Sequence, residues 1–494
     1  MNRFTALLFA AALAVVPAAQ LGATGSRIPD SGSRPSTRSE RAEALERDDA
    51  AITHVLNRLT FGARPGEVDR VRTLGLSTWF DQQLHPSRID DQAAEAMLAP
   101  LDEPPNNGDP QELRRFARRQ IETLASTKIL RAMYSERQLQ EVLVDFWFNH
   151  FNVYAAKGRT AEYLPDYERD VIRPHVFDRF RDLLEADAKS PAMLFYLDNW
   201  LSAGPDQGSG IRDRGSRAFL RRRPRAVFPN PRPPMPDPRQ AAQSAKRKRG
   251  LNENYGRELL ELHTLGVDGG YTQQDVINVA RAFTGWTIDR RDNRFRFVPA
   301  LHDSGEKVVL GHTIKAGGGI EDGEQVLDIL ASHPATAHHI AFELVQRLVA
   351  DEPPPALVER AAARFRETKG DLREVVKAIV TSPEFLSPSA RNAKFKTPFE
   401  LVVSAVRTTG VSVSDARAFV QTLQQLGEPL YMCQPPTGYH DTADAWVSAG
   451  GLVTRMNFAT RLASGNMPGV ALPANAPPAQ ELALRIGSPE FQRH

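Results

Sequence analysis

The densest polar cluster in the sequence lies between Asn252 and His263. If this stretch is helical, Glu258 and Glu261 lie one turn apart on one face, together with Asn254. Two carboxylates in that arrangement can hold a divalent cation, or they can divide the roles of general acid and general base. The spacing makes these two glutamates the first candidates for catalysis or metal binding.

The same stretch also has a purely structural interpretation. Glu253, Arg257 and Glu261 are spaced i, i+4 and i+8, which is the pattern of an ion-pair ladder on a helix surface. Spacing alone favours this ladder, and His263 falls off the carboxylate face.

Histidines supply the other candidates. His302 precedes Asp303 in an expected turn, where the pair could serve as acid and base, although Asp-Ser-Gly is also ordinary turn chemistry. His150 ends an apolar helical stripe, a place that suits a metal ligand, a base or a buried structural histidine. The candidate catalytic residues are Glu258, Glu261, His302 and Asp303, and the candidate ligands of a divalent metal are His150, Glu258 and Glu261.

Most of the chain that must position these residues has helical periodicity. Between Leu139 and Trp147, for example, apolar residues recur three and four positions apart. Two short strands, 295–298 and 307–310, predict one hairpin across the turn at 302–305. The fold class is therefore mainly α, a large multi-helix globular fold with a minor β-hairpin. Helices are expected over 112–151, 176–200, 251–265, 272–285, 332–348, 371–380, 400–408, 414–426 and 452–462.

The amino-terminal residues predict export. Arg3 precedes an apolar run from Phe4 to Val16, and Val16-Pro17-Ala18 offers small residues for cleavage, so residues 1–18 have the features of a signal peptide. Residues 19–50 predict a flexible leader, 51–465 one large helical domain, and 466–494 a C-terminal tail. We expect the protein to be periplasmic or secreted, with no membrane-spanning segment in the mature chain.

The charge is unevenly distributed. Residues 204–250 contain thirteen Lys and Arg, three Asp and eight Pro, a net charge of +10, so the rest of the chain carries −8 of the formal total of +2. A basic insertion of this kind can contact an anionic surface or an acidic partner, or it can be a solvated loop. Cys433 is the only cysteine, so we expect no internal disulfide and no disulfide-linked partner.

Several strong catalytic motifs are missing. The sequence has no Gly-x-Ser-x-Gly elbow, no Walker-type phosphate loop, no His-Glu-x-x-His and no Cys-x-x-Cys-His. Each absence disfavours a common enzyme class.

Distinct sequence blocks point to a family. They are Gly250–Gly266 with Tyr271-Thr272 and Arg281–Trp286, Asn57–Gly62, Phe146–Phe151, His302-Asp303 with Gly305 and Lys307, His333–Ala337, Ser382–Phe385 and Lys396–Glu400. Together, over residues 52–464, they closely resemble the bacterial family called domain of unknown function 1800. The resemblance implies an exported, largely helical protein, often encoded beside a sulfatase-like exported protein, and it implies no reaction.

One late segment departs from that family. Its members usually have a Pro-Pro-Asn-Val-Lys-Gly-Trp-like run, whereas this chain has Pro435–Tyr439, with Trp446 following. Two functions stay open at this stage. The protein is either a metal-assisted hydrolase of an envelope or extracellular polymer, or a non-catalytic protein that binds or matures a partner.

Overall fold

The computed structural model describes residues 48–98, 109–204 and 250–494, and these belong to one compact unit. The predicted signal peptide, almost all of the leader and nearly all of the basic insertion lie outside the described residues. In the part that is described, helices dominate and strands form only short antiparallel pairs, which confirms the predicted mainly α fold.

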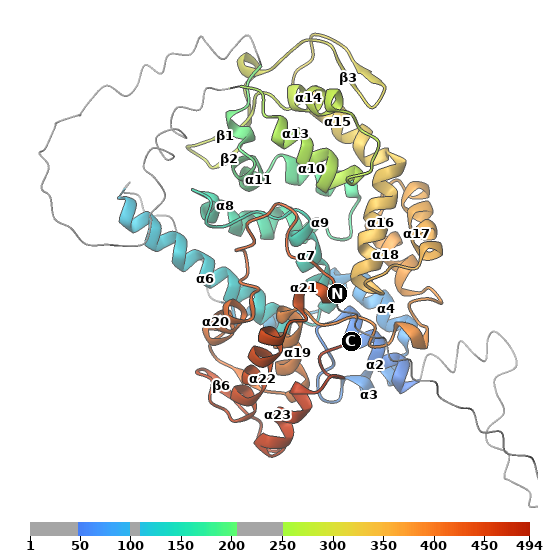
Figure 1. Ribbon diagram of the computed structural model, residues 1–494, viewed down its shortest axis with the longest axis vertical. Coiled ribbons are helices and arrows are strands. Elements are labelled where there is room, and N and C mark those ends of the chain that lie inside the picture. Colours follow the sequence, from blue (N-terminus) through green and yellow to red (C-terminus); the bar gives the residue numbers. More distant parts are fainter. Residues whose placement is uncertain (1–47, 99–108, 205–249) are drawn as a thin grey trace, which may run out of the picture. The chain divides into compact units, whose positions relative to one another are not determined.

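The first half of the unit is helical. In Figure 1, α7 lies near the middle of the unit, and α6 extends from there to its left-hand edge. Its longer helices are α2 (Asp49–Leu59), α3 (Glu67–Leu74), α4 (Leu76–Leu84), α6 (Pro110–Tyr134), α7 (Gln138–His150), α8 (Thr160–Asp166), α10 (Phe180–Ala188) and α11 (Pro191–Tyr196), with shorter α5 (Gln92–Glu95) and α9 (Arg173–His175).

The second half adds helices on either side of α6 and α7, with α13 to α15 above them and α19 to α23 below in Figure 1. These helices are α13 (Glu253–Leu260), α14 (Gln273–Ala282), α15 (Ile320–Ser332), α16 (Pro334–Leu348), α17 (Pro355–Glu367), α18 (Leu372–Val380), α19 (Pro398–Thr409), α20 (Arg417–Leu426), α21 (Ala443–Trp446), α22 (Ala449–Ala463) and α23 (Ala479–Gly487).

The two predicted strands form, as β2 and β3, but each pairs with a strand that the sequence did not predict. β2 (Arg294–Phe297) pairs with β1 (Trp286–Asp289), and β3 (Lys307–Val309) pairs with β4 (His312–Ile314). The expected hairpin between 295–298 and 307–310 is therefore wrong. Each of the two strands pairs with a strand that is nearer in the sequence and is joined to it by a short turn. Residues 302–305 belong to the segment that connects these two hairpins. A third pair joins β5 (Ser412–Val413) to β6 (Val470–Ala471).

The expected helix over 112–151 is divided into α6 and α7. The division is fixed by Asp91, whose carboxylate accepts hydrogen bonds from the Ser135 hydroxyl at 2.8 Å and from the Glu136 amide at 2.7 Å. Because these bonds come from a distant segment, the local periodicity contains no sign of the break.

Residues 466–494, expected to be a tail, contain α23, which packs against α22. The chain ends at His494, whose side chain is buried and whose Nδ1 lies 2.8 Å from the Asn57 carbonyl oxygen.

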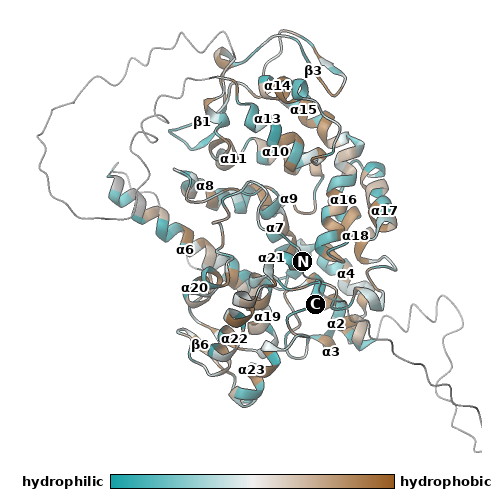
Figure 2. Ribbon diagram, in the orientation of Figure 1, coloured by the Kyte–Doolittle hydropathy of each residue, from teal (hydrophilic) through white to brown (hydrophobic). Residues whose placement is uncertain are grey.

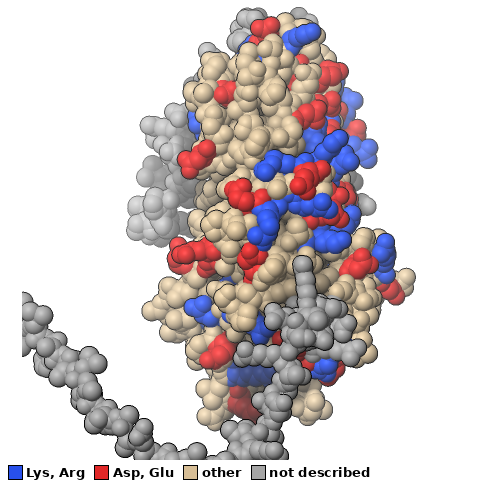
Figure 3. All heavy atoms as spheres, turned by 90° about the vertical axis from the view of Figure 1, so that its right-hand side faces the viewer, with Lys and Arg blue, Asp and Glu red and all other residues tan. Residues whose placement is uncertain are grey.

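Apolar faces of the helices supply the core, and Figure 2 shows hydrophilic and hydrophobic residues alternating along most of them. Trp147 and Phe151, both fully buried, lie near the centre with Phe180. No helix among the described residues has the length and apolar character needed to span a bilayer. On the face drawn in Figure 3, basic and acidic side chains are interspersed rather than separated by sign.

Candidate functional site

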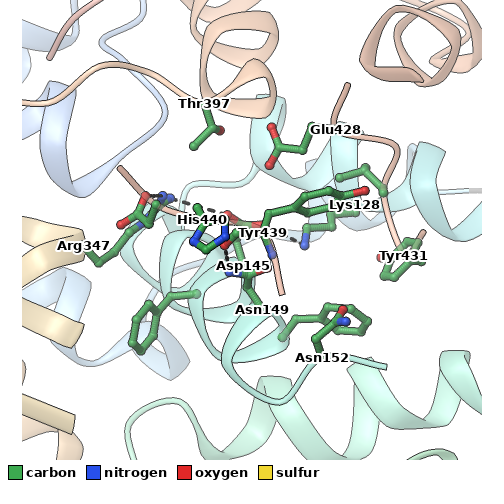
Figure 4. A pocket seen from close by; sticks show the side chains of 14 residues that line it. Lys128, Asp145, Asn149, Asn152, Arg347, Thr397, Glu428, Tyr431, Tyr439 and His440 are labelled. Carbon is green, nitrogen blue, oxygen red and sulfur yellow. Dashed lines mark hydrogen bonds and ion pairs between the residues drawn. The ribbon is translucent and has the colours of Figure 1, made fainter. Parts of the chain in front are cut away.

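A small polar cavity of about 50 Å³ lies where α6, α7, α16, the start of α19 and the loop 428–441 meet. Figure 4 shows its side chains converging from these segments. A cavity of this size admits water. Its lining consists of Lys128, Asp145, Phe146, Phe148, Asn149, Asn152, Arg347, Thr397, Glu428, Leu430, Tyr431, Tyr439, His440 and Asp441.

Helix α7 supplies one wall through its spacing. Asp145 and Asn149 lie one turn apart on the same face of α7, and Asn152 follows just after the helix ends; all three line the cavity. Trp147 and Phe151, on another face, are fully buried in the core. The polar face of the helix is directed toward the cavity because its apolar face packs in the core.

Asn149 of α7 and Asn152, just after the helix, hold the loop 428–441 in place. The Asn149 amide donates to the Tyr439 carbonyl at 2.6 Å, and its oxygen accepts from the Tyr439 amide at 2.7 Å. Asn152 donates to the carbonyls of Cys433 and Pro435 at 3.0 and 2.7 Å. Gly438 is required here, since its φ is +68° and a Cβ would lie 2.3 Å from the Asn149 carbonyl oxygen.

Charged side chains in the wall are paired with one another. Lys128 Nζ lies 2.8 Å from Asp145, and the buried Arg347 lies 3.5 Å from Asp145 and 3.0 Å from Asp441. Arg347 also lies 3.0 Å from Glu400. Asp145 therefore has two cationic neighbours.

Aromatic rings surround the ammonium group of Lys128. The rings of Phe148, Phe399 and Tyr431 have their centroids 5.2, 5.5 and 5.6 Å from Nζ. Such contacts stabilise a buried cation beyond its ion pair.

Burial raises the pKa of two carboxyl groups that line the cavity, Asp441 and Glu428. Burial, and next the negative charge of Asp145, raise the pKa of Glu428 to about 8, while the hydrogen bond donated by the Phe399 amide to its Oε2 at 2.7 Å acts in the opposite direction. At neutral pH this carboxyl group is mostly protonated. The cavity therefore combines Glu428, whose pKa is raised, with Asp145, which is paired with Lys128, and this combination suits acid–base catalysis.

The sequence-predicted residues lie outside this lining. His150 is on α7, but its Nδ1 lies 2.7 Å from Glu343 of α16, and neither residue lines the cavity. Glu343 also lies 3.5 Å from His339, so the three side chains link α7 to α16.

Glu258 and Glu261 do lie near one another. Burial, together with the charge of Glu261, raises the pKa of Glu258. Glu261 accepts a hydrogen bond from the Tyr271 hydroxyl at 2.7 Å. The predicted ladder does not form in this helix, because Arg257 donates to Gln273 at 2.7 Å instead.

The expected metal ligands are not brought together. Among the described residues, no three His, Cys, Asp or Glu side chains form a group that could hold a metal ion, so His150, Glu258 and Glu261 do not make one.

His302 and Asp303 belong to a separate buried network. His302 Nε2 and Lys307 Nζ lie 3.1 and 2.6 Å from the same oxygen of Asp322. Asp303 pairs with Arg281 at 2.8 Å. No hydrogen bond, ion pair or ring contact joins this network to Glu258 or Glu261 in the described structure.

Sequence reasoning missed the cavity, although a signal was present. Three conspicuous segments converge on it, namely Phe146–Phe151, Lys396–Glu400 and the loop around Pro435–Tyr439. Considering these blocks together, rather than looking for dense clusters of charge, would have found the site.

Comparison with known proteins places the chain in a family without adding a reaction. No curated protein and no solved structure matches it. The family described as protein of unknown function (DUF1800) matches residues 54–493, which is most of the chain. The chain belongs to this family, as its sequence blocks predicted.

Proposed function

We propose that the protein is an exported hydrolase that cleaves an envelope or extracellular polymer by acid–base catalysis in the cavity. The observation that carries the proposal is that the buried Glu428, whose pKa is raised to about 8, shares a cavity that admits water with Asp145, which is paired with Lys128. Perturbed titratable groups that share a cavity are typical of catalytic sites.

Each residue has a definite role in this reaction. Asp145 accepts a proton from water, and the water oxygen attacks the electrophilic centre of the substrate. The bond to the leaving group breaks as Glu428 transfers its proton to the leaving atom, which is oxygen in a glycan or an ester and nitrogen in a peptide. Lys128, whose Nζ lies 2.8 Å from Asp145, holds that carboxylate in position. Proton exchange with solvent returns both carboxyl groups to their starting states.

The experiment is an assay of the mature protein on polysaccharide, peptide and polyester substrates, with Glu428→Gln and Asp145→Asn as test variants. Each variant should lower the rate by at least about a hundredfold, the usual contribution of a general acid or base. Glu359→Gln is a matched control, since this glutamate of α17 is 64% exposed and outside the cavity. If Glu258→Gln removes activity and the cavity variants do not, the chemistry lies on α13 and the proposal is wrong.

Export is a separate part of the proposal and rests on residues 1–18. Expression of the full chain in a Gram-negative host, followed by fractionation and amino-terminal sequencing, should give a periplasmic or secreted product that starts near residue 19. An uncleaved cytoplasmic product contradicts this part.

The basic insertion supports a second, non-catalytic candidate. Its net charge of +10 suits contact with an anionic surface or with an acidic partner, such as a co-encoded sulfatase-like protein. Deletion of residues 212–249 should abolish salt-sensitive binding to anionic vesicles or to that partner. Unchanged binding would argue against this candidate.

A further inference from the structure

We propose that this site acts on an uncharged glycan whose sugar rings stack on the side chains of Tyr439 and Trp446, beside the cavity. The inference rests on the proposed hydrolase function and adds the substrate class. It follows from the charge balance of the cavity, from the aromatic groups beside it and from its size.

The charge balance disfavours charged ligands. Lys128 is paired with Asp145, and Arg347 is paired with Asp145 and Asp441. Glu428 is mostly uncharged at neutral pH because burial raises its pKa to about 8. Lys128 and Arg347 would thus have no unpaired charge to offer a sulfate, phosphate or carboxylate ligand. Such a ligand would also lie near the carboxylates of Asp145 and Asp441, so it would lose its hydration without gaining an ion pair.

Two aromatic side chains make the surface beside the cavity suitable for sugar rings. Tyr439 lines the cavity, and its ring centroid is 6.0 Å from that of Trp446 in α21. Both side chains are partly exposed. The Trp446 indole donates to the His440 carbonyl at 2.8 Å, which fixes the orientation of its ring. A sugar ring has an apolar face of C–H groups and an edge of hydroxyl groups, so it matches an aromatic surface bordered by polar atoms.

The size of the cavity places the sugar rings outside it. About 50 Å³ holds water but not a hexose, whereas the Tyr439–Trp446 pair is next to the cavity and accessible. The glycan would therefore lie on the aromatic pair and present one glycosidic bond to Glu428 and Asp145. That bond has the oxygen leaving group that a protonated carboxyl group serves.

The test measures binding separately from hydrolysis. The Glu428→Gln variant of the mature protein is titrated calorimetrically with neutral hexasaccharides of glucose, xylose, galactose and N-acetylglucosamine, and with hexagalacturonate and a sulfated galactan hexasaccharide. At least one neutral glycan should bind, and the charged glycans should bind at least about tenfold more weakly or not at all. Binding of only the charged glycans, or of none, overturns the inference.

Variants at the aromatic pair locate the binding site. Trp446→Ala in the same background should weaken binding by about tenfold or more, as expected when a large aromatic contact is removed, and Trp446→Phe should recover part of it. Phe342→Ala is the control, since Phe342 is 37% exposed on α16 and outside the cavity lining. Equal affinity in Trp446→Ala and its parent overturns the inference.

The outcomes for the two proposals are distinguishable. A neutral glycan that binds through Trp446 but is not cleaved by the unmodified protein supports the ligand class and contradicts the hydrolase. Cleavage of a peptide or polyester that depends on Glu428 supports the hydrolase proposal and overturns the inference that the substrate is a glycan.

Discussion

Asn149 binds the main chain of Tyr439 through both ends of its side-chain amide, with contacts of 2.6 and 2.7 Å across nearly 300 residues of sequence. The asparagine thereby takes the place of a strand partner for a loop that has no regular structure. The loop carries Glu428, Tyr439 and His440 into the lining of the cavity. By fixing the loop to α7, the Asn149 side chain therefore helps to determine which residues line the cavity.

Removing that connection should loosen the loop. In Asn149→Ala, amide hydrogen exchange measured by mass spectrometry should accelerate over 433–441, because two hydrogen bonds are lost together. Asn149→Asp should have a smaller effect, since it still accepts from the Tyr439 amide. The exposed Asn466→Ala is the control, and equal exchange in it and in Asn149→Ala would show that the amide pair does not secure the loop.

Glu428 should make the protein less stable as pH rises. Its pKa of about 8 in the folded chain lies above its ordinary value of 4.5, so between these values the folded state holds a proton that the unfolded chain has released. The free energy of unfolding should therefore fall by up to about 1.4 kcal/mol per pH unit across this window. Urea denaturation of the protein and of Glu428→Gln at several pH values isolates this contribution. Parallel pH profiles of the two proteins would contradict it.

The same group predicts the pH dependence of catalysis. If protonated Glu428 is the general acid, hydrolysis should decline as pH rises through about 8, because the proton to be transferred is lost. The logarithm of kcat/KM against pH measures this, and a rate that stays constant to pH 10 would exclude Glu428 as the acid.

The buried group around Asp322 should contribute stability rather than chemistry. Lys307 and Asp322 are both 1% exposed, so Asp322→Ala leaves a buried ammonium group without its partner and should cost about 3–5 kcal/mol of unfolding free energy. The double variant Lys307→Met/Asp322→Leu should be less destabilised, because it removes both charges. Thermal denaturation measures the difference, and a double variant as unstable as Asp322→Ala would contradict this account.

Cys433 should be unreactive in the folded protein. Burial, and next the nearby Glu428, raise the pKa of its thiol to about 11, so little thiolate forms at pH 8. Iodoacetamide should modify it only after denaturation, as followed by intact mass. Rapid alkylation of the native protein would show that the thiol is accessible and ionised.

Features that depend only on residues close together in the sequence could be predicted. The spacing of Thr272 and Asp275 predicted the capping box that begins α14, and the apolar periodicity predicted most helices. Glu258 and Glu261 are neighbours because they are one turn apart. The pairing of the strands failed as a prediction because several partners were compatible with the same short apolar runs.

The sequence by itself determined a mainly helical chain of the DUF1800 family with a basic insertion and one cysteine. Only the tertiary structure decided which carboxyl groups share a cavity and which of them keeps its proton. Asp145 and Glu428 are separated by nearly 300 residues, so no local pattern relates them. The pKa of Glu428 is set by burial and by neighbours from α7, α19 and α6, and these neighbours meet only when the chain is packed.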